Sequence, residues 1–182
     1  ECKDGQAGLG AMVNVGMFEA VNRIAGKYTP YLPGTPVRGT GSIEAAAASA
    51  AHDVLVALCP DQAEGFARAL KSSLAAVKDA KARDAGAKVG KAAAAALLAA
   101  RADSGANVPD PLFDAPVVGT YVPTIERVGV SIARIRPWVM TRPDEVRAAP
   151  PPALDSDTWA RDFNEIKRLG GKTTLNERFT AI

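Results

Sequence analysis

Proline is distributed unevenly along this chain, and its distribution limits where helices can form. Nine of the thirteen prolines lie between Pro109 and Pro152, whereas apolar residues at helical spacing fill most of residues 4–103. Because proline breaks helices and biases the preceding residue toward extended backbone, we expect helices before residue 104 and an extended segment after it. We call residues 104–155 the arm. Its many apolar residues are unsuited to a solvated linker, so the arm should pack on the helices or on a partner segment.

Residues 4–25 and 42–58 form the first two predicted helices. In the first, apolar residues recur every three or four positions. Three glycines weaken this helix and imply that a close neighbour holds it: Gly8, Gly10 and Gly16. The second helix begins after Ser42, a candidate N-cap, and ends before Pro60.

Two further helices are predicted before the arm and one after it. The third begins at a cap pair formed by Asp61 and Glu64, and the fourth, residues 79–101, is the richest in alanine. The basic residues of the fourth helix, among them Arg83, should form its solvated face. After the arm, residues 156–169 form a helix that Ser156 caps. Its expected buried stripe consists of Trp159, Phe163, Ile166 and Leu169.

Hydrophobic residues make up 47% of the chain, but aromatic residues only 5%, so small aliphatic residues dominate the composition. Alanine favours helix and lets helix backbones approach closely. We therefore predict an all-α fold, a helical bundle of five to six helices that carries the long proline-rich arm. Its expected parts are a helical bundle at residues 1–103, the arm at 104–155 and C-terminal helices at 156–182. Within the arm, residues 117–122 form at most a short strand between prolines.

A sixth helix is predicted only at the end of the chain. Thr174 and Glu177 have the T-x-x-E spacing of a capping box, which opens a helix, yet the chain stops at Ile182. We expect this helix to be truncated. The chain also starts without methionine, so we expect a processed or trimmed product.

Charge and hydropathy exclude two classes of partner. The net charge of +2 gives no basic footprint for nucleic acid. The longest apolar run, residues 92–100, is too short to cross a bilayer as a helix. We therefore expect no nucleic-acid partner and no transmembrane segment.

Two cysteines, Cys2 and Cys59, permit one disulfide at most. Because Cys2 lies at a terminus and Cys59 at a predicted helix end, the favoured interpretation is two unpaired thiols. The alternative is a Cys2–Cys59 bridge, which would join two helices and point to an exported protein.

His52 is the only histidine, and it precedes Asp53 in the middle of a predicted helix. A catalytic base or metal ligand is its functional interpretation. No other residue at ligand spacing supports a metal, so we favour a histidine packed between helices and bonded to a backbone carbonyl. The glycines of residues 5–10 follow no strand and lack a Lys-Ser/Thr pair, which excludes a nucleotide loop. We assign no catalytic, cofactor-binding or metal-binding residue to this chain.

A series of arginines follows the arm. Guanidinium groups match the oxygens of phosphate or another oxyanion, which makes an anion site one interpretation. The favoured interpretation is a solvated or ion-paired arm, because Asp144 and Glu145 lie nearby in the sequence. The arginines are Arg127, Arg134, Arg136, Arg142 and Arg147.

Seven stretches of the sequence carry a family resemblance through their order and spacing. They are AMVNVGMFEAVNRI at 11–24, YTPY at 28–31, EAAAASAAHDVLVAL at 44–58, GTYVPT at 119–124, RPW at 136–138, PPPALDS at 150–156 and DFNEIKRLG at 162–170. Together they resemble the N-terminal helical region of the bacterial vanadium-dependent haloperoxidase-related proteins. These proteins belong to the type 2 phosphatidic acid phosphatase superfamily.

The resemblance implies an all-helical region that packs against a second helical bundle. In the family, the second bundle holds vanadate or phosphate with a lysine, arginines and two histidines. One histidine bonds the central atom and the other acts as acid and base, while the cations neutralise the oxygens. This chain has one histidine and no Pro-Ser-Gly-His sequence, so the resemblance transfers no catalytic residue to it.

The expected function is the N-terminal scaffold part of a vanadium-haloperoxidase-like oxidoreductase or an acid-phosphatase-like hydrolase. The chain alone is expected to be inactive, and the arm around Trp138 is the part expected nearest to a substrate. The expected partner is a C-terminal catalytic segment or a second chain of the same protein, and a homo-oligomer is a further option. Vanadate as cofactor, or phosphate as substrate, is implied for the complete enzyme, and the family implies export. The alternative function is a non-catalytic helical interaction protein.

Overall fold

The computed structural model describes residues 2, 5–33, 39–105, 117, 120, 122 and 129–170. In this part of the chain all regular secondary structure is helical, which confirms the predicted all-α class. The described α-helices are α1 (Gly5–Ala25), α2 (Ile43–Leu58), α3 (Ala63–Ala76), α4 (Ala80–Ala100) and α5 (Asp157–Leu169). The short 3-10 helices are η1 (Pro60–Gln62) and η2 (Val130–Arg134). The predicted sixth helix and most of the possible strand at 117–122 lie outside the described residues.

Local capping signals fix most helix starts where the sequence predicted them. The Ser42 hydroxyl accepts from the backbone N–H of Ala45 at 3.1 Å, and Ser156 accepts from Trp159 at 3.2 Å. Ser42 also donates to Glu44 Oε2 at 2.6 Å, and this bond, together with a backbone N–H, lowers the pKa of Glu44. The expected Asp61–Glu64 cap of α3 is wrong. Asp61 lies inside η1, so α3 starts at Ala63 after Gln62.

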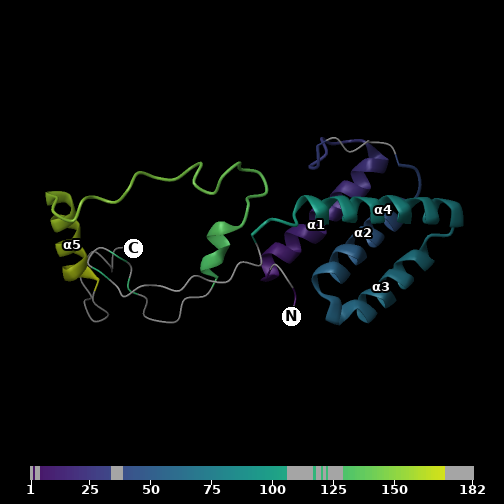
Figure 1. Cartoon of the computed structure of the whole chain (residues 1–182), viewed down its shortest axis with the longest axis horizontal. Helices are drawn as coiled ribbons and strands as arrows, with labels where there is room; N and C mark the ends of the chain where they lie inside the picture. The colour runs from purple at the N-terminus through teal and green to yellow at the C-terminus, as the bar shows by residue number, and fades with distance from the viewer. Residues whose placement is uncertain are drawn as a thin grey trace, which may run out of the picture. The chain divides into compact units, whose positions relative to one another are not determined.

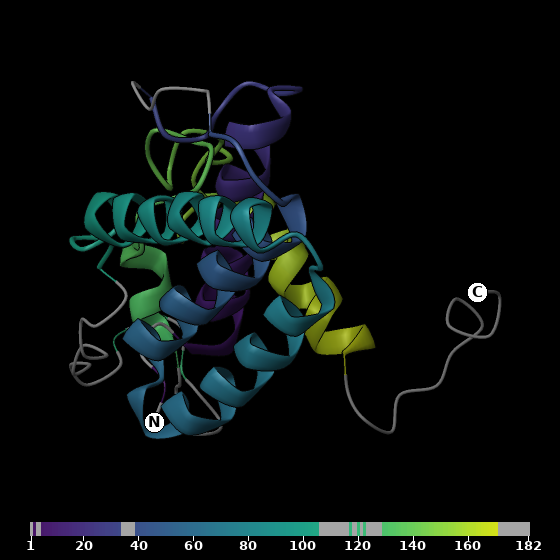
Figure 2. The same ribbon diagram turned by 90° about the vertical axis from the view of Figure 1, so that its right-hand side faces the viewer.

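Helix α2 is the centre of the bundle that α1–α4 form (Figures 1 and 2). It packs against both α1 and α4, which also touch each other, and α3 lies mainly along α2. The buried hydrophobic residues form two clusters, of which one is alanine alone. One cluster consists of Ala20, Ala46, Ala50 and Ala93, and a second of Met12, Leu32, Val54, Leu58, Cys59, Ala94 and Leu97.

Backbone contact between α4 and α2 explains this alanine cluster. A Cβ atom added at Gly90 would lie 2.2 Å from the carbonyl oxygen of Ala46, and one added at Gly86 would lie 2.2 Å from that of Ser42. The Ser42 N–H donates to the Ala82 carbonyl at 2.8 Å, which joins the start of α2 directly to α4. Only glycine allows this approach, since any side chain would overlap the facing backbone.

The glycines of α1 behave differently from one another. A Cβ added at Gly16 would lie 3.2 Å from Val54 of α2 and 3.6 Å from Leu97 of α4, so the expected close neighbour exists there. Gly10, by contrast, has nothing within 4 Å of an added Cβ. Gly10 therefore lies on the exposed side of α1, whereas Gly16 and the buried Met12 lie on its packed side.

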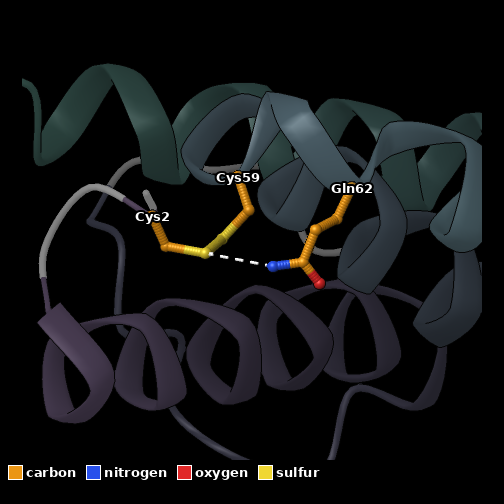
Figure 3. Close-up of a disulfide and its surroundings, with 3 residues drawn as sticks. All are labelled: Cys2, Cys59 and Gln62. Atoms are coloured by element: carbon orange, nitrogen blue, oxygen red, sulfur yellow. Dashed lines mark hydrogen bonds between the residues drawn. A yellow bond between two sulfur atoms is a disulfide. The ribbon is translucent and has the colours of Figure 1, made fainter.

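A disulfide joins Cys2 to Cys59, and the favoured interpretation of two unpaired thiols is wrong. The two Cα atoms lie 4.4 Å apart, within the range that a disulfide requires. The bond links the chain just before α1 to the end of α2, because α1 packs along α2 and brings the two positions together (Figure 3). The side-chain amide nitrogen of Gln62 points at the Cys2 sulfur, 3.7 Å away.

The chain divides into two compact units. One contains residues 1–111 and 129–139, and the other contains residues 112–128 and 140–182. The first unit therefore holds α1–α4 together with η2, and the second holds α5. The predicted division at residues 103 and 155 stays a prediction.

Helix α5 does not bury the apolar stripe expected of it. Phe163 is 51% exposed and Ile166 is 70% exposed, and no residue of α5 is buried. Trp159 and Phe163 instead stack on each other, with ring centroids 5.0 Å apart. The periodicity identified an amphipathic helix correctly, but it cannot show what covers the apolar face.

Among the described helices, none combines the length and the hydropathy that a membrane span requires. This agrees with the short apolar run in α4, which charged residues bound at both ends.

Substituting Gly90 by alanine should destabilise the fold although alanine is the better helix former. The added methyl group would overlap Ala46 and Ser49 of α2, so we expect the free energy of unfolding to fall by about 2 kcal/mol. Gly10→Ala is the matched control, and it should raise the free energy of unfolding by about 0.5–1 kcal/mol. Urea denaturation measures the free energy of unfolding of both variants. Equal effects of the two substitutions would contradict the close contact of α2 and α4.

Breaking the disulfide should destabilise the protein mainly by raising the conformational entropy of its unfolded state. The bridge spans 57 residues, and the closure entropy of such a loop corresponds to about 4 kcal/mol. Cys2→Ser should therefore lower the urea midpoint, and reductant should lower the wild-type midpoint equally. Reductant should leave the variant unchanged. A wild-type midpoint that is insensitive to reductant would contradict the bridge.

Candidate functional site

His52 lies on α2 and bonds a carboxylate. Its Nδ1 lies 2.7 Å from Asp53 Oδ1, so the expected bond to a backbone carbonyl is wrong. Because a carboxylate only accepts hydrogen bonds, Nδ1 carries the hydrogen of this bond. The other ring nitrogen, Nε2, is then the one left for a ligand. The His52 side chain is 20% exposed, which is compatible with such contact.

A groove lies beside His52, between α2, α3 and the start of α4. Its volume is about 440 Å³, within the range of small-molecule sites. Its apolar lining comes from one side of α3, namely Ala67, Leu70, Leu74 and Ala75. Its polar lining consists of the basic side chains His52, Lys71 and Arg83. Arg83, expected on the solvated face of its helix, has a side chain that is 34% exposed and also lines this groove.

A smaller cavity of about 140 Å³ adjoins the groove and shares His52 and Leu70 with it. Ser73 also lines this cavity, which places a hydroxyl near the only histidine. No hydrogen bond joins Ser73 to His52 in the part of the chain that the structure describes, so the residues do not form an activated nucleophile. The same described residues contain no group of three or more metal-ligating side chains.

The arm arginines take different positions. Arg142 pairs with Asp144, with 3.2 Å between Nε and Oδ1, as expected of an ion-paired arm. Arg136 instead donates from Nη2 to the carbonyl of Ala100 at the end of α4. Arg134 and Arg147 are exposed, and Arg127 lies outside the described residues. The described arginines therefore form no common anion site within either unit.

Arg101 fixes the arm around Trp138 to the end of α4. Its side chain is only 6% exposed, and Nη1 and Nη2 donate to the carbonyls of Pro137 and Arg136 at 3.1 and 2.6 Å. The guanidinium also lies over the Trp138 ring, with Cζ 4.1 Å from the ring centroid. The Trp138 ring in turn meets Tyr31 at 5.7 Å between centroids. The sequence analysis singled out Trp138 but not Arg101. The residues around Arg101 in the sequence indicate only the end of a helix.

Two buried polar side chains of α1 hold the segment that follows it. Glu19 is 1% exposed, and its Oε1 accepts from the backbone N–H groups of Tyr31 and Leu32 at 2.5 and 3.2 Å. Asn22 bonds both backbone groups of Tyr28, at 2.7 and 2.9 Å. A carboxylate bonded to backbone donors fixes a loop firmly. These contacts keep Tyr31 in place against Trp138.

No known protein family, curated protein or solved structure matches this chain.

Arg101→Lys should release the segment around Trp138 while keeping the positive charge. Lysine lacks the planar fork that reaches two carbonyls and stacks on the indole, so we expect the free energy of unfolding to fall by about 1–3 kcal/mol. In a Trp159→Phe background, the emission of Trp138 should shift to longer wavelength. Arg68→Lys is the control, since the exposed Arg68 pairs with the exposed Glu64 at 3.8 Å. An unchanged emission in Arg101→Lys would show that Arg101 does not fix Trp138.

Proposed function

We propose that this chain is the N-terminal scaffold part of a vanadium-haloperoxidase-like or acid-phosphatase-like enzyme. Its oxyanion site, for vanadate or phosphate, would be formed by a C-terminal segment or a second chain of the same protein. The observation that carries the proposal is the apolar face of α5, where Phe163 and Ile166 are exposed. An amphipathic helix of this kind normally packs on another element.

The fixed position of Trp138 also supports a scaffold role. Arg101 holds the backbone on both sides of Pro137 and covers the indole, and Tyr31 contacts the same ring. A segment fixed by buried hydrogen bonds is suited to forming one wall of a site that another part completes. In this proposal the chain positions a substrate pocket and supplies none of the reacting groups.

The disulfide supports the export of this protein. Disulfides persist in oxidising compartments and are rare in the cytosol. The Cys2–Cys59 bridge joins two segments that carry the core, so its loss would affect the whole bundle. We therefore propose a periplasmic or secreted location.

A non-catalytic helical interaction protein is the second candidate. The exposed face of α5 favours it equally, because any helical partner would cover Phe163 and Ile166. The two candidates differ in what the partner does after it binds. A catalytic partner brings halide oxidation or phosphate-ester hydrolysis, whereas a structural partner brings neither.

The chemistry is tested with the protein at its natural length, isolated from its source. We expect either halide oxidation that depends on vanadate and peroxide, or hydrolysis of a phosphate ester, and residues 1–182 alone should show neither. Halide oxidation would assign the haloperoxidase class, and ester hydrolysis the phosphatase class. Absence of both activities from the natural-length protein would favour the interaction protein.

Ile166→Asp in the natural-length protein tests the proposed role of α5. Placing a charge on a face that a partner covers should lower activity roughly ten- to a hundredfold, because burial of one isoleucine is worth about 1.5–3 kcal/mol. Asn164→Asp adds the same charge at an exposed polar position of α5 and should leave activity unchanged. Equal activity of the two variants would contradict docking through α5.

A further inference from the structure

The groove between α2, α3 and α4 combines an apolar wall with three basic side chains. One side of α3 supplies Leu70 and Leu74, and the polar lining consists of Lys71, Arg83 and His52. A wall of aliphatic side chains favours an alkyl chain, whereas cations favour an anionic group. The groove therefore favours a ligand that has both an alkyl chain and an anionic group.

The positive charge of the groove is only partly neutralised by the protein. Asp53 lies beside His52, and Asp84 Oδ1 meets Arg83 Nε at 3.0 Å. Asp84 is exposed and occupies only this edge of the Arg83 guanidinium, which leaves further N–H groups for a ligand. The Lys71 ammonium has no hydrogen-bond or ion-pair partner within the described ranges. An anion in the groove would therefore add a partner for Lys71 and a second one for Arg83.

We propose that this groove binds a single-chain aliphatic carboxylate, with its alkyl chain along Leu70 and Leu74 and its carboxylate near Lys71 and Arg83. The volume of about 440 Å³ suits one small ligand of this kind. His52 lies on the same lining and adds a polar ring to it. This site is independent of the oxyanion site of the proposed enzyme, and it uses α2, α3 and α4 alone.

Calorimetric titration with sodium dodecanoate, kept below its micelle concentration and at low salt, tests the proposal. We expect saturable binding of one molecule per chain. Lys71→Gln should weaken it roughly tenfold, the amount that loss of one charge-assisted hydrogen bond implies. Lys78→Gln removes the same charge from an exposed position outside the groove lining and should leave the dissociation constant unchanged. Lys71 is itself exposed, so its substitution should not affect folding.

Two further sets of measurements complete the test. The first separates the contribution of the alkyl chain to binding from that of the carboxylate charge, and the second distinguishes binding of a free ligand from binding to a membrane. Dodecanol should bind more weakly than dodecanoate, and Lys71→Gln should narrow that difference because Arg83 still faces the carboxylate. Leu74→Asn should weaken binding of both ligands, with circular dichroism used to confirm that the variant folds. Equal affinity of Lys71→Gln and Lys78→Gln, or the absence of saturable binding, would overturn the proposal. Binding to phosphatidylglycerol vesicles without binding of monomeric dodecanoate would overturn it as well.

Discussion

The contact of α4 with the start of α2 is the constraint on which the bundle depends. At Gly86 and Gly90 the two backbones approach so closely that no side chain fits between them. This approach explains why one of the two buried clusters consists of alanine alone and why a backbone hydrogen bond, from Ser42 to Ala82, can join the two helices. A cluster of alanines buries little apolar area per residue, so the fold needs other sources of stability.

Those other sources are covalent and polar. The Cys2–Cys59 bridge limits the unfolded chain, and buried polar side chains fix segments that lack secondary structure. Glu19 holds the backbone at Tyr31, and Arg101 holds the backbone around Pro137. Because Tyr31 and Trp138 then meet, two segments far apart in the sequence form one fixed surface at the end of the bundle. We propose that this surface and the exposed face of α5 serve a catalytic partner.

The features that could be predicted from the sequence are the local ones. Alanine content and apolar spacing identified the helices, and Ser42 and Ser156 marked two helix starts because a cap acts within three residues. Features that depend on distant partners were missed or misjudged. Cysteine pairing depends on how α1 packs along α2, and the groove depends on Arg83 of α4 and His52 of α2 lining the same space. The exposed state of Ile166 likewise depends on what packs on α5, which periodicity does not encode.

Hydrogen exchange followed by mass spectrometry tests most directly whether the α2–α4 contact organises the fold. If it does, the amides of α2 and α4 exchange only on global unfolding, and those at Tyr31 and Leu32 are protected by Glu19. The amides of α5 should exchange much faster, and they should become protected when a partner covers Phe163 and Ile166. Exchange of α4 at the rate of α5 would contradict the account, because it would show that the close contact does not hold the bundle together.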